Sequence, residues 1–370
     1  MTKINQDLQF IVLDPRKRKR ALIADLLAPL GAINWWRIPP FGLRGYPETT
    51  EKAYLAAEAA IFPARSRLTR KIQRSLYAML YNGSRTFFER HPDAVAVVWN
   101  GLNGVRRVFA DGARDAGART LFFELAPFKD RITCDPLGVN YANSLPRRTG
   151  PYRDWAAQSA TPPDAWQAER ARIRQRVPLR AAPASKGASI TSGPFLFAPL
   201  QVPGDSQLRL FGGAFRTVPD FIDALVAASE SLPEGWHLRI KEHPSSGQSY
   251  AHLVLGPRVV LDNASDTFDL VSRSEGVVTV NSSVGLEAMF FERPVVACGQ
   301  CFWAIPGVAD LAPDQKALAS RFAEAPVLSF DPDARSAFLN YLLCEYYIAT
   351  DGSDRNSSAK IKSRLALGAP

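Results

Sequence analysis

The amino-acid sequence contains no apolar run long enough to cross a membrane, and it has few cysteines. A membrane-spanning helix needs about 20 mostly apolar residues, and no run in the 370-residue chain reaches that length. The four cysteines, Cys134, Cys298, Cys301 and Cys344, are too few and too scattered for a disulfide framework. The first residues also lack the apolar segment of a signal peptide, so we expect a cytoplasmic chain.

The signatures of several enzyme classes are missing as well. There is no Walker loop and no G-x-G-x-x-G motif, which argues against a nucleoside triphosphatase and a dinucleotide-dependent dehydrogenase. The four histidines are not clustered, which argues against a catalytic metal site. Cys298 and Cys301 form one C-x-x-C unit without a second pair, so we interpret them as ordinary thiols. We therefore expect neither a metal nor another cofactor.

The charge of the chain is more informative than the motifs that it lacks. Lys and Arg total 45 against 36 Asp and Glu, a net charge of +9, and 46% of the residues are hydrophobic. This is the composition of a globular protein that favours anionic partners: nucleic acid, phosphate-bearing substrates or an acidic membrane surface. The basic run Arg16–Arg20 is either a solvated helix face or a patch for anionic lipid headgroups. It contains no interleaved aromatic residues, which argues against nucleic acid.

Short apolar runs alternate with helical patterns along the whole chain, which predicts an α/β fold with parallel sheets. The expected strands are 10–13, 33–38, 94–99, 120–123, 195–197, 238–240, 259–261, 277–280 and 295–297, and the expected helices include 16–30, 51–90 and 333–349. Residues 177–194 are rich in Pro, Ala, Ser and Gly, as an interdomain linker would be. We expect an N-terminal domain over 1–185, a C-terminal domain over 186–349 and a polar, basic tail over 350–370. Ligands of such folds bind beyond the carboxyl ends of the strands, here in a cleft between the domains.

The first candidate site follows the expected strand 238–240. Pro244 ends that strand, so His243 lies at its carboxyl end, where an imidazole can bind a phosphate or transfer a proton and Lys241 can add positive charge. An ordinary turn histidine explains the stretch equally well. His91-Pro92 serves as an internal comparison, because it precedes a strand and is expected only to end a helix.

The second candidate site is the stretch Asn281–Ala288, where a strand stops and a helix begins. Asn281 or Ser282 can cap that helix, and its free amides and the hydroxyls of Ser282 and Ser283 can bind an anion. Glu287, about one turn later, can accept hydrogen bonds from a ribose. A capped helix without a ligand explains this stretch alone, but together with Lys241 and His243 it favours a phosphate site.

Two carboxylates are candidates for glycosyl chemistry, which uses such a pair. Glu124 ends an apolar run, and Asp205 follows Pro203-Gly204, where a turn residue is the commoner explanation. Asn100, after a strand, and Asn140, in a loop rich in turn formers, are weaker candidates for binding an acceptor.

These stretches together resemble the bacterial capsule polysaccharide synthesis family, the β-Kdo transferases that use CMP-Kdo, and within it the branch that starts the Kdo linker on a phosphatidylglycerol-type lipid. The resemblance runs from about Val95 to Gly299. Its motifs are Trp99–Gly101, Phe123-Glu124, Asp135–Asn140, Lys241–Pro244, Asn281–Ala288 and Pro294–Val296. The His-Pro and Ser-Ser pairs also resemble those of bacterial sialyltransferases, which use CMP-sugars as well.

The resemblance implies a GT-B fold of two Rossmann-like domains, with the donor bound by the C-terminal one. It implies that His243, Ser282 and Ser283 contact the CMP phosphate and that Glu287 holds the ribose, and it assigns Lys241, Pro244, Asn281 and Gln201 to the donor site. It further implies retaining transfer with Asp205 as nucleophile or stabiliser and Glu124 as acid/base, although Leu125 stands where many relatives have a second acidic residue. Asn100 and Asn140 would bind the acceptor, and no metal is needed.

The leading hypothesis is therefore transfer of Kdo to a (lyso)phosphatidylglycerol-type lipid or a growing Kdo linker by a peripheral enzyme. The enzyme would work at the inner face of the cytoplasmic membrane, within a capsule biosynthesis complex and without nucleic acid. The alternatives are another CMP-sugar transferase of sialyltransferase type and a non-catalytic capsule assembly protein.

Overall fold

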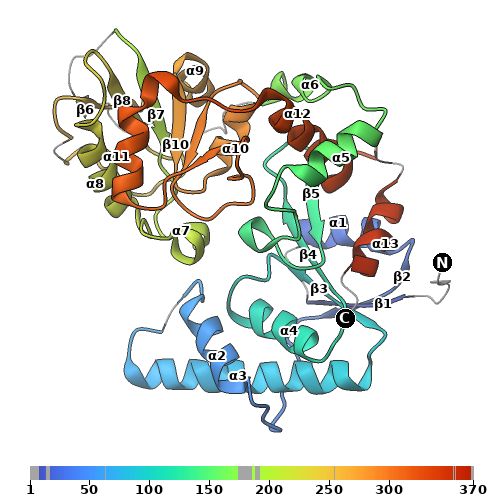
Figure 1. Cartoon of the computed structure of the whole chain (residues 1–370). Coiled ribbons are helices and arrows are strands. Elements are labelled where there is room, and N and C mark those ends of the chain that lie inside the picture. Colours follow the sequence, from blue (N-terminus) through green and yellow to red (C-terminus); the bar gives the residue numbers. More distant parts are fainter. Residues whose placement is uncertain are drawn as a thin grey trace. The chain divides into compact units, whose positions relative to one another are not determined.

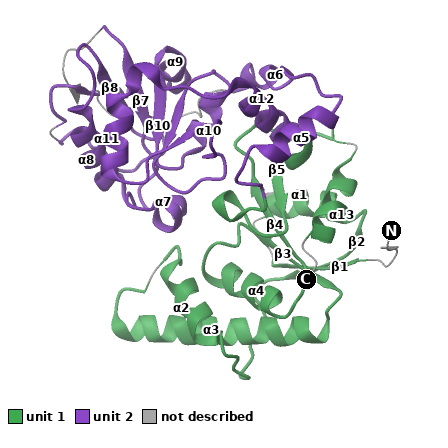
Figure 2. Ribbon diagram, in the orientation of Figure 1, with its two compact units in different colours: residues 1–144, 345–370 green, residues 145–344 purple. Residues whose placement is uncertain are grey.

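A computed structural model describes residues 8–13, 17–62, 64–173, 186–187, 192–253, 255–352, 354 and 356–367. The chain divides into two compact units, one of residues 1–144 with 345–370 and one of residues 145–344 (Figure 2). The expected domain boundary after residue 185 and most of the expected linker 177–194 lie outside the described residues. The two units divide the chain at other positions, and residues 350–370 belong to the first unit instead of forming a separate tail.

The first unit is built on a mixed sheet whose described strands lie in the order β13-β5-β4-β3-β1-β2 (Figure 1). The strands β1 to β4 are parallel, and β5 and β13 extend the sheet in antiparallel pairing. Their bounds are β1 (Leu8–Leu13), β2 (Gly31–Trp36), β3 (Ala94–Trp99), β4 (Thr120–Leu125), β5 (Arg131–Asp135) and β13 (Ile348–Ala349). Every residue of β3 is buried, which explains its unbroken apolar sequence, because helices cover both faces of such a strand.

The helices of the first unit are α1 (Lys17–Leu27), α2 (Thr49–Glu58), α3 (Arg67–Arg90), α4 (Gly104–Asp115), the short 3-10 turn η1 (Asn140–Ala142) and α13 (Ser357–Leu367). The single expected helix 51–90 is thus two helices. Ser66 starts α3 with a capping box shared with Thr69, and His91 ends it. The His91 ring stacks on Phe87, and β3 follows at Ala94, which confirms that the His91-Pro92 pair ends a helix.

The second unit contains a sheet in the order β12-β11-β10-β7-β8-β9-β6 among the described residues. All neighbours are parallel except β6 and β9. The strands are β6 (Lys186–Gly187), β7 (Phe195–Pro199), β8 (His237–Lys241), β9 (Val259–Leu261), β10 (Gly276–Thr279), β11 (Val295–Ala297) and β12 (Asp310–Leu311). From β7 the chain first adds β8 and β9 on one side and then adds β10 on the other. The order therefore reverses between β7 and β10, the place where open α/β sheets bind ligands.

Nine helical segments of the second unit flank this sheet or extend beyond it within the described residues, and a tenth begins in this unit and ends in the first one. They are α5 (Gly150–Gln158), α6 (Gln167–Arg170), α7 (Ser206–Phe211), α8 (Val218–Ser229), α9 (Thr267–Arg273), α10 (Ser283–Met289), α11 (Gln315–Ala323), η2 (Ala325–Val327), α12 (Pro332–Tyr341) and the π-helical turn η3 (Leu342–Tyr346). No described helix of either unit has the length and apolarity to span a membrane.

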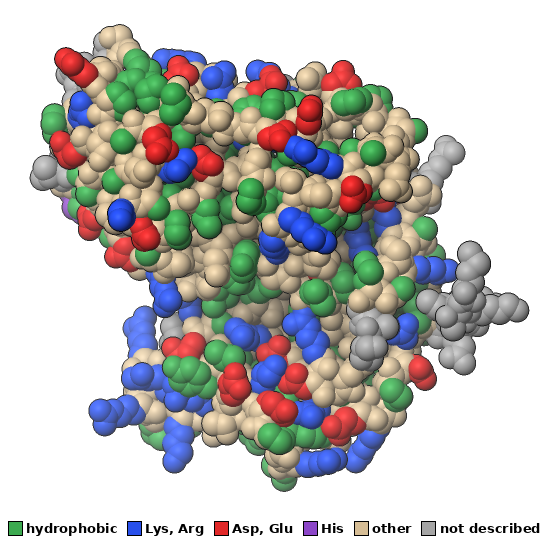
Figure 3. All heavy atoms as spheres, in the orientation of Figure 1, with side chains coloured by type: hydrophobic (Ala, Val, Ile, Leu, Met, Phe, Trp, Pro, Cys, Tyr) green, Lys and Arg blue, Asp and Glu red, His purple; other side chains and the backbone are tan. Residues whose placement is uncertain are grey.

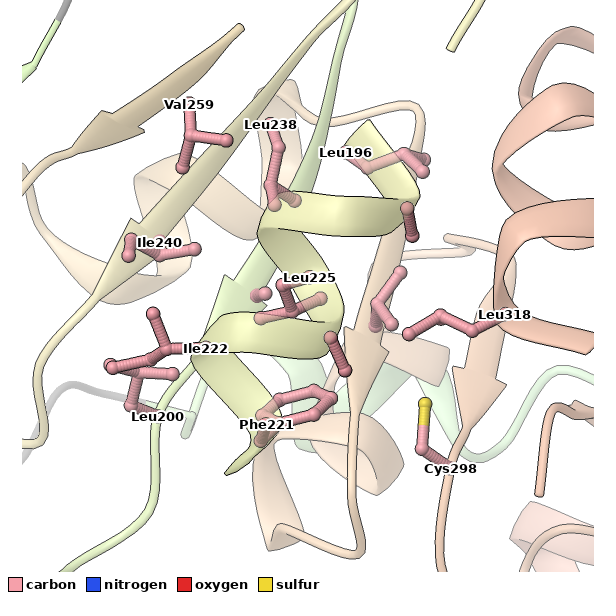
Figure 4. Close-up of a cluster of buried hydrophobic side chains, with 14 of the residues drawn as sticks. Leu196, Leu200, Phe221, Ile222, Leu225, Leu238, Ile240, Val259, Cys298 and Leu318 are labelled. Atoms are coloured by element: carbon pink, nitrogen blue, oxygen red, sulfur yellow. The ribbon is translucent and has the colours of Figure 1, made fainter. Parts of the chain in front are cut away.

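The core of the second unit shows why α8 packs on the sheet. Thr217 caps α8, and Phe221, Ile222 and Leu225 follow at helical spacing, so that one face is apolar. Figure 4 shows these side chains directed toward strand residues such as Leu238. Burial of one such side chain contributes about 1.5–3 kcal/mol to folding.

Each apolar run predicted to be a strand is a strand, with ends that differ by at most two residues from the prediction. The expected helix 333–349 is shorter than predicted. The helix α12 ends at Tyr341, and the π-helical turn η3 and then the strand β13 follow it. Ile348 is fully buried in this strand and pairs with Ile132, so pairing with β5 overrides the helical pattern there.

Candidate functional site

A hollow lies in the second unit at the carboxyl ends of β7, β8 and β10. Residues that follow these strands line it together with the starts of α9 and α10. They are Pro199, Leu200, Lys241, Glu242, His243, Pro244, Thr267, Phe268, Ser282, Ser283, Val284 and Glu287. The hollow therefore brings both candidate strand ends of the sequence together within one compact unit. It lies where the strand order reverses, between β7 and β10.

Lys241 is the last residue of β8, and its side chain is buried in the wall of the hollow. The ammonium donates hydrogen bonds to the backbone carbonyl oxygens of Asn263, at 3.0 Å, and Ser265, at 2.6 Å. Burial lowers the pKa of Lys241, and the carboxylates of Asp262 and Asp266 oppose that shift. The lysine thus fixes the loop between β9 and α9 while it brings a positive charge to the hollow.

His243 lies two residues after β8 and is half-buried in the same wall. Its Nδ1 accepts a hydrogen bond from the backbone N–H of Ser245 at 3.0 Å. A neutral ring that accepts at Nδ1 carries its hydrogen at Nε2, so Nε2 is a donor. The ring is therefore part of a turn and also part of the wall of the hollow, and its contact with a phosphate stays a prediction.

Ser282 and Ser283 form the start of α10. The Ser282 hydroxyl oxygen accepts from the Val284 N–H at 3.2 Å and caps the helix, while the Ser283 hydroxyl lies 3.5 Å from a carboxylate oxygen of Glu287. The sequence predicted this cap correctly. The helix has only seven residues, so its dipole is small, and binding of an anion by the two hydroxyls stays a prediction.

Gly285 lets α10 lie close to its own unit. A Cβ atom at this position would stand 2.6 Å from the Trp303 ring and 2.9 Å from the Thr279 methyl carbon. Contacts this short do not occur between real atoms, so a larger residue here would force the Trp303 ring, the Thr279 side chain or α10 to move.

Six residues of the hollow were given no role from the sequence, although Glu242 and Val284 stand within the motifs 241–244 and 281–288; the six are Pro199, Leu200, Glu242, Thr267, Phe268 and Val284. The Glu242 carboxylate is buried, and Oε1 accepts hydrogen bonds from Ser249 Oγ and from the Tyr250 N–H. Its other oxygen, Oε2, has no hydrogen-bond partner within the described residues. The only sequence signal for Glu242 was its place between Lys241 and His243.

Gln201 and Asn281, both expected in the donor site, bond to each other. Gln201 Nε2 donates to Asn281 Oδ1 at 3.0 Å, and Asn281 Nδ2 donates to the carbonyl oxygens of Gln207 and Gln300. These amides connect the end of β7 to the start of α10, and neither residue lines the hollow. Their expected contact with a donor stays a prediction.

The two carboxylates expected in the chemistry belong to different units. Asp205 caps α7, where its side chain accepts from the Gln207 N–H at 2.9 Å. Glu124 is the next-to-last residue of β4, and its Oε2 accepts from Asn100 Nδ2 at 2.7 Å. Each carboxylate thus has a local structural partner, and an experiment on its chemistry has to preserve that contact.

The two asparagines proposed for the acceptor share a rare backbone conformation. Asn100 has φ of 66° and Asn140 has φ of 54°, in the left-handed region where asparagine is one of the few tolerated residues. Both occupy sharp turns of the first unit, as their neighbours Gly101 and Gly138 indicate.

The cysteines are free thiols, and three of them are buried. Burial raises the pKa of Cys134 to about 12 and also raises the pKa values of Cys298 and Cys301. These thiols are therefore protonated at neutral pH. Within the described residues, no group of three or more His, Cys, Asp or Glu side chains could hold a metal ion.

Comparison with known proteins gives this arrangement a context. The sequence profile of the family described as capsule polysaccharide biosynthesis protein matches residues 165–351, which include every residue of the hollow. Protein FixF of Sinorhizobium fredii is 31% identical over 276 residues, which are 73% of this chain and 64% of FixF. The capsule polysaccharide export protein KpsS of Escherichia coli is 28% identical over 144 residues, which are 33% of this chain and 37% of KpsS. The chain therefore spans less than two thirds of these relatives.

A solved structure confirms the fold class. KpsC of Thermosulfurimonas dismutans, a beta Kdo 2,7 transferase, superposes with a TM-score of 0.52 at 13% sequence identity, over 98% of this chain and 99% of the KpsC chain. The fold is GT-B, as the two largely parallel sheets and this match indicate.

Proposed function

Because this chain belongs to the capsule polysaccharide biosynthesis family, we propose that it is a glycosyltransferase that transfers Kdo from CMP-β-Kdo. The observation that carries the proposal is the hollow of the second unit, where Lys241, His243 and the Ser282-Ser283 pair line one space. A lysine, an imidazole donor and two hydroxyls suit a phosphate group. The similarity to KpsC, itself a Kdo transferase, supports Kdo as the sugar.

In this proposal the hollow holds the CMP half of the donor. His243 Nε2–H and the hydroxyls of Ser282 and Ser283 donate to the phosphate, and Lys241 adds positive charge from the wall. The Glu287 carboxylate, which lies 3.5 Å from the Ser283 hydroxyl, accepts hydrogen bonds from the ribose. Pro244, Gln201 and Asn281 keep the ends of β7, β8 and β10 in place.

The proposed transfer retains configuration and uses the two carboxylates. Asp205 attacks the anomeric carbon or stabilises its positive charge, while the bond from that carbon to the phosphate oxygen breaks and CMP leaves with the bonding electrons. The acceptor hydroxyl oxygen then bonds to the same carbon, any bond from that carbon to Asp205 breaks with its electrons returning to the carboxylate, and Glu124 takes the hydroxyl proton. The leaving phosphate gains negative charge in the transition state, so donors already oriented toward it lower the barrier. The step uses no metal ion.

We propose a (lyso)phosphatidylglycerol-type lipid or a growing Kdo linker as the acceptor, with Asn100 and Asn140 contacting it. Such an acceptor places the enzyme at the inner face of the cytoplasmic membrane, in contact with other capsule biosynthesis proteins. The net charge of +9 is compatible with an anionic acceptor.

The direct test is to incubate the purified protein with CMP-Kdo and a short-chain lysophosphatidylglycerol and to follow the product by mass. Asp205→Asn and Glu124→Gln are the informative variants, because asparagine still caps a helix and glutamine still accepts from Asn100. Asp314→Asn is the matched control, since Asp314 caps α11 in the same way. We expect a loss of transfer of at least about 100-fold in the first two variants and wild-type transfer in the control. Wild-type transfer by Asp205→Asn would remove Asp205 from the chemistry.

A donor panel separates the proposal from its alternatives. If CMP-sialic acid is used and CMP-Kdo is not, the enzyme is a different CMP-sugar transferase. If calorimetry detects no CMP binding, the hollow is not a CMP site and a non-catalytic assembly role replaces the proposal.

A further inference from the structure

The first half of α3, in the first unit, exposes apolar side chains to solvent. Leu68 is 69% exposed and Ile72 is 59% exposed, and Leu76 continues the row with a four-residue spacing. Four residues are slightly more than one helical turn, so these side chains form one stripe along the helix. Three exposed aliphatic residues in a row cost solvation energy unless something covers them.

This stripe is not a face that packs on the rest of the first unit. The face of α3 that packs inward carries Tyr77, Leu80 and Tyr81, which are buried in a small core with α2 and α4. Leu68 precedes Tyr77 by nine residues, about two and a half turns, so the two side chains point in opposite directions. The exposed stripe therefore has a use other than folding.

Basic side chains stand next to the apolar stripe and continue around the helix: Arg67 and Lys71 each come one residue before an exposed aliphatic residue, and Arg70 and Arg74 lie farther around. Arg67, Arg70, Lys71 and Arg74 line a single open hollow on α3. Arg74 pairs with Glu58, whereas no ion pair is found for the other three among the described residues. The sequence has no acidic residue between Glu58 and Glu89. Figure 3 shows Lys and Arg side chains gathered over the start of α3, at the lower left.

This arrangement works against the helix itself. Cations in the first turns oppose the helix dipole, and like charges three and four residues apart repel each other. The first turn of α3 has no acidic residue to balance them. A sequence optimised only for helix stability would place acidic residues there, so the charge is better explained by a partner.

Further exposed apolar residues continue the surface at both ends of the stripe. Ile61 and Phe62, 60% and 85% exposed, precede α3. On the other end the Gly42 N–H donates to the Met79 carbonyl oxygen, so the loop with the exposed Phe41 and Leu43 lies along α3 beyond Leu76.

We propose that this surface, here named the α3 patch, docks the protein on an anionic lipid bilayer. The patch consists of Phe41, Leu43, Ile61, Phe62, Arg67, Leu68, Arg70, Lys71, Ile72, Arg74 and Leu76. The aliphatic and aromatic side chains enter the boundary between headgroups and acyl chains, and the basic hollow takes lipid phosphates. A nucleic acid would use the cations but not the exposed aliphatic stripe, which is why the bilayer fits better. The inference extends the proposed function, which needs access to a lipid acceptor, but it rests on residues outside the donor hollow.

The basic run Arg16–Arg20, which the sequence indicated for this role, fits less well. Lys19 lies 4.1 Å above the Trp99 ring and Arg20 lies 4.4 Å above the Trp35 ring, so both are engaged by the protein itself. The side chains of Arg16 and Arg18 lie outside the described residues.

The test is co-sedimentation of the whole protein with vesicles of phosphatidylcholine, with and without about one third phosphatidylglycerol. We expect binding to the anionic vesicles that weakens as salt screens the charges. Arg67→Glu/Arg70→Glu/Lys71→Glu should weaken it by at least about 100-fold. Leu68→Ser/Ile72→Ser should weaken it at least about tenfold and leave binding to heparin, a soluble polyanion, unchanged.

The control triple Lys129→Glu/Lys316→Glu/Lys362→Glu makes the same change of net charge at exposed lysines outside the patch. It should retain more binding than the patch triple. Equal loss in both triples, equal binding to neutral vesicles, or unchanged binding of the serine variant would each overturn the proposal. A wild-type protein that binds heparin but not vesicles would also overturn it. So would a wild-type protein that forms a dimer and does not bind vesicles, if the serine variant dissociates that dimer. CMP binding, read in parallel, should be unchanged in every variant, so that failure here is separate from failure of the proposed function.

Discussion

At the scale of single residues, the His243 ring is the most decisive feature of the hollow. Its Nδ1 is held by the Ser245 N–H, so the donor Nε2–H has a fixed direction. A charge-assisted hydrogen bond to phosphate is worth about 1.5–3 kcal/mol. We therefore expect His243→Ala to weaken CMP binding about 10- to 100-fold in calorimetry, and His243→Gln, which keeps a donor at the position of Nε2, to weaken it less.

The chain supplies its own control for this experiment. His91 also precedes a proline, and it ends α3 with its ring stacked on Phe87. His91→Ala should leave CMP affinity at the wild-type value. Unchanged affinity in His243→Ala as well would exclude the imidazole from the phosphate site.

The two adjacent serines allow an effect on the stability of the fold to be distinguished from an effect on ligand binding. Ser282 caps α10, whereas Ser283 makes no capping bond. Ser282→Ala should lower the free energy of unfolding by about 0.5–2 kcal/mol and also weaken CMP binding. Ser283→Ala should weaken CMP binding about tenfold without that loss of stability. Chemical denaturation and calorimetry on the two variants give the comparison, and equal stability losses would contradict the assigned cap.

At the scale of elements, the position of α10 depends on Gly285. An added methyl group would meet the Trp303 ring and the Thr279 methyl carbon, so α10 or Trp303 would have to move. We expect Gly285→Ala to lower the free energy of unfolding by about 1–3 kcal/mol and to weaken CMP binding through the displaced serines. Gly150→Ala is the matched control, because Gly150 starts α5 with open space around it. A Gly285→Ala variant as stable as wild type would show that Trp303 and Thr279 move aside at little cost in free energy.

The sequence predicted the elements that are buried and continuous, and it missed those that pairing alone creates. The run Ala94–Trp99 predicted β3 to the residue, because a strand buried on both faces must be apolar throughout. The strand β5, whose sequence is RITCD, carries too mixed a pattern to be predicted, and β13 is only two residues long. β5 exists because it pairs with β4, and β13 exists because it pairs with β5 at the edge of the sheet.

The same distinction holds for the candidate site. Lys241, His243 and Ser282 follow strands in the sequence, and parallel strands bring their carboxyl ends to one edge, so their meeting could be predicted. Thr267 and Phe268 reach the hollow because Lys241 fixes the loop before α9 through two backbone carbonyls. A contact of a side chain with distant backbone leaves no pattern in the sequence.

At the scale of the whole molecule, stability should depend on pH through His237, a residue outside the hollow. His237 starts β8, is 1% exposed, and accepts a hydrogen bond from Arg239 Nε at 3.1 Å. Arg239 in turn pairs with Asp262 at 2.9 Å, and the Phe195 ring covers the imidazole. Burial and the Arg239 charge lower the pKa of His237 from 6.5 to about 4. Charging the ring would place two cations side by side in the core, so the folded chain keeps it neutral.

The sign of the effect follows from proton uptake. Above pH 6.5 the ring is neutral in both states and contributes no pH dependence. Between pH 6.5 and 4 the histidine is protonated in the unfolded chain but stays neutral in the folded chain, so stability falls as the pH falls. We expect a loss of about 1–2 kcal/mol between pH 7 and 5 in the unfolding of the second unit. His237→Gln keeps an acceptor for Arg239 and cannot be protonated. The loss of unfolding free energy between pH 7 and 5 should therefore be smaller in that variant by the same amount. Urea unfolding at pH 7, 6 and 5 measures both slopes, and parallel slopes would mean that His237 is protonated without cost in the folded chain.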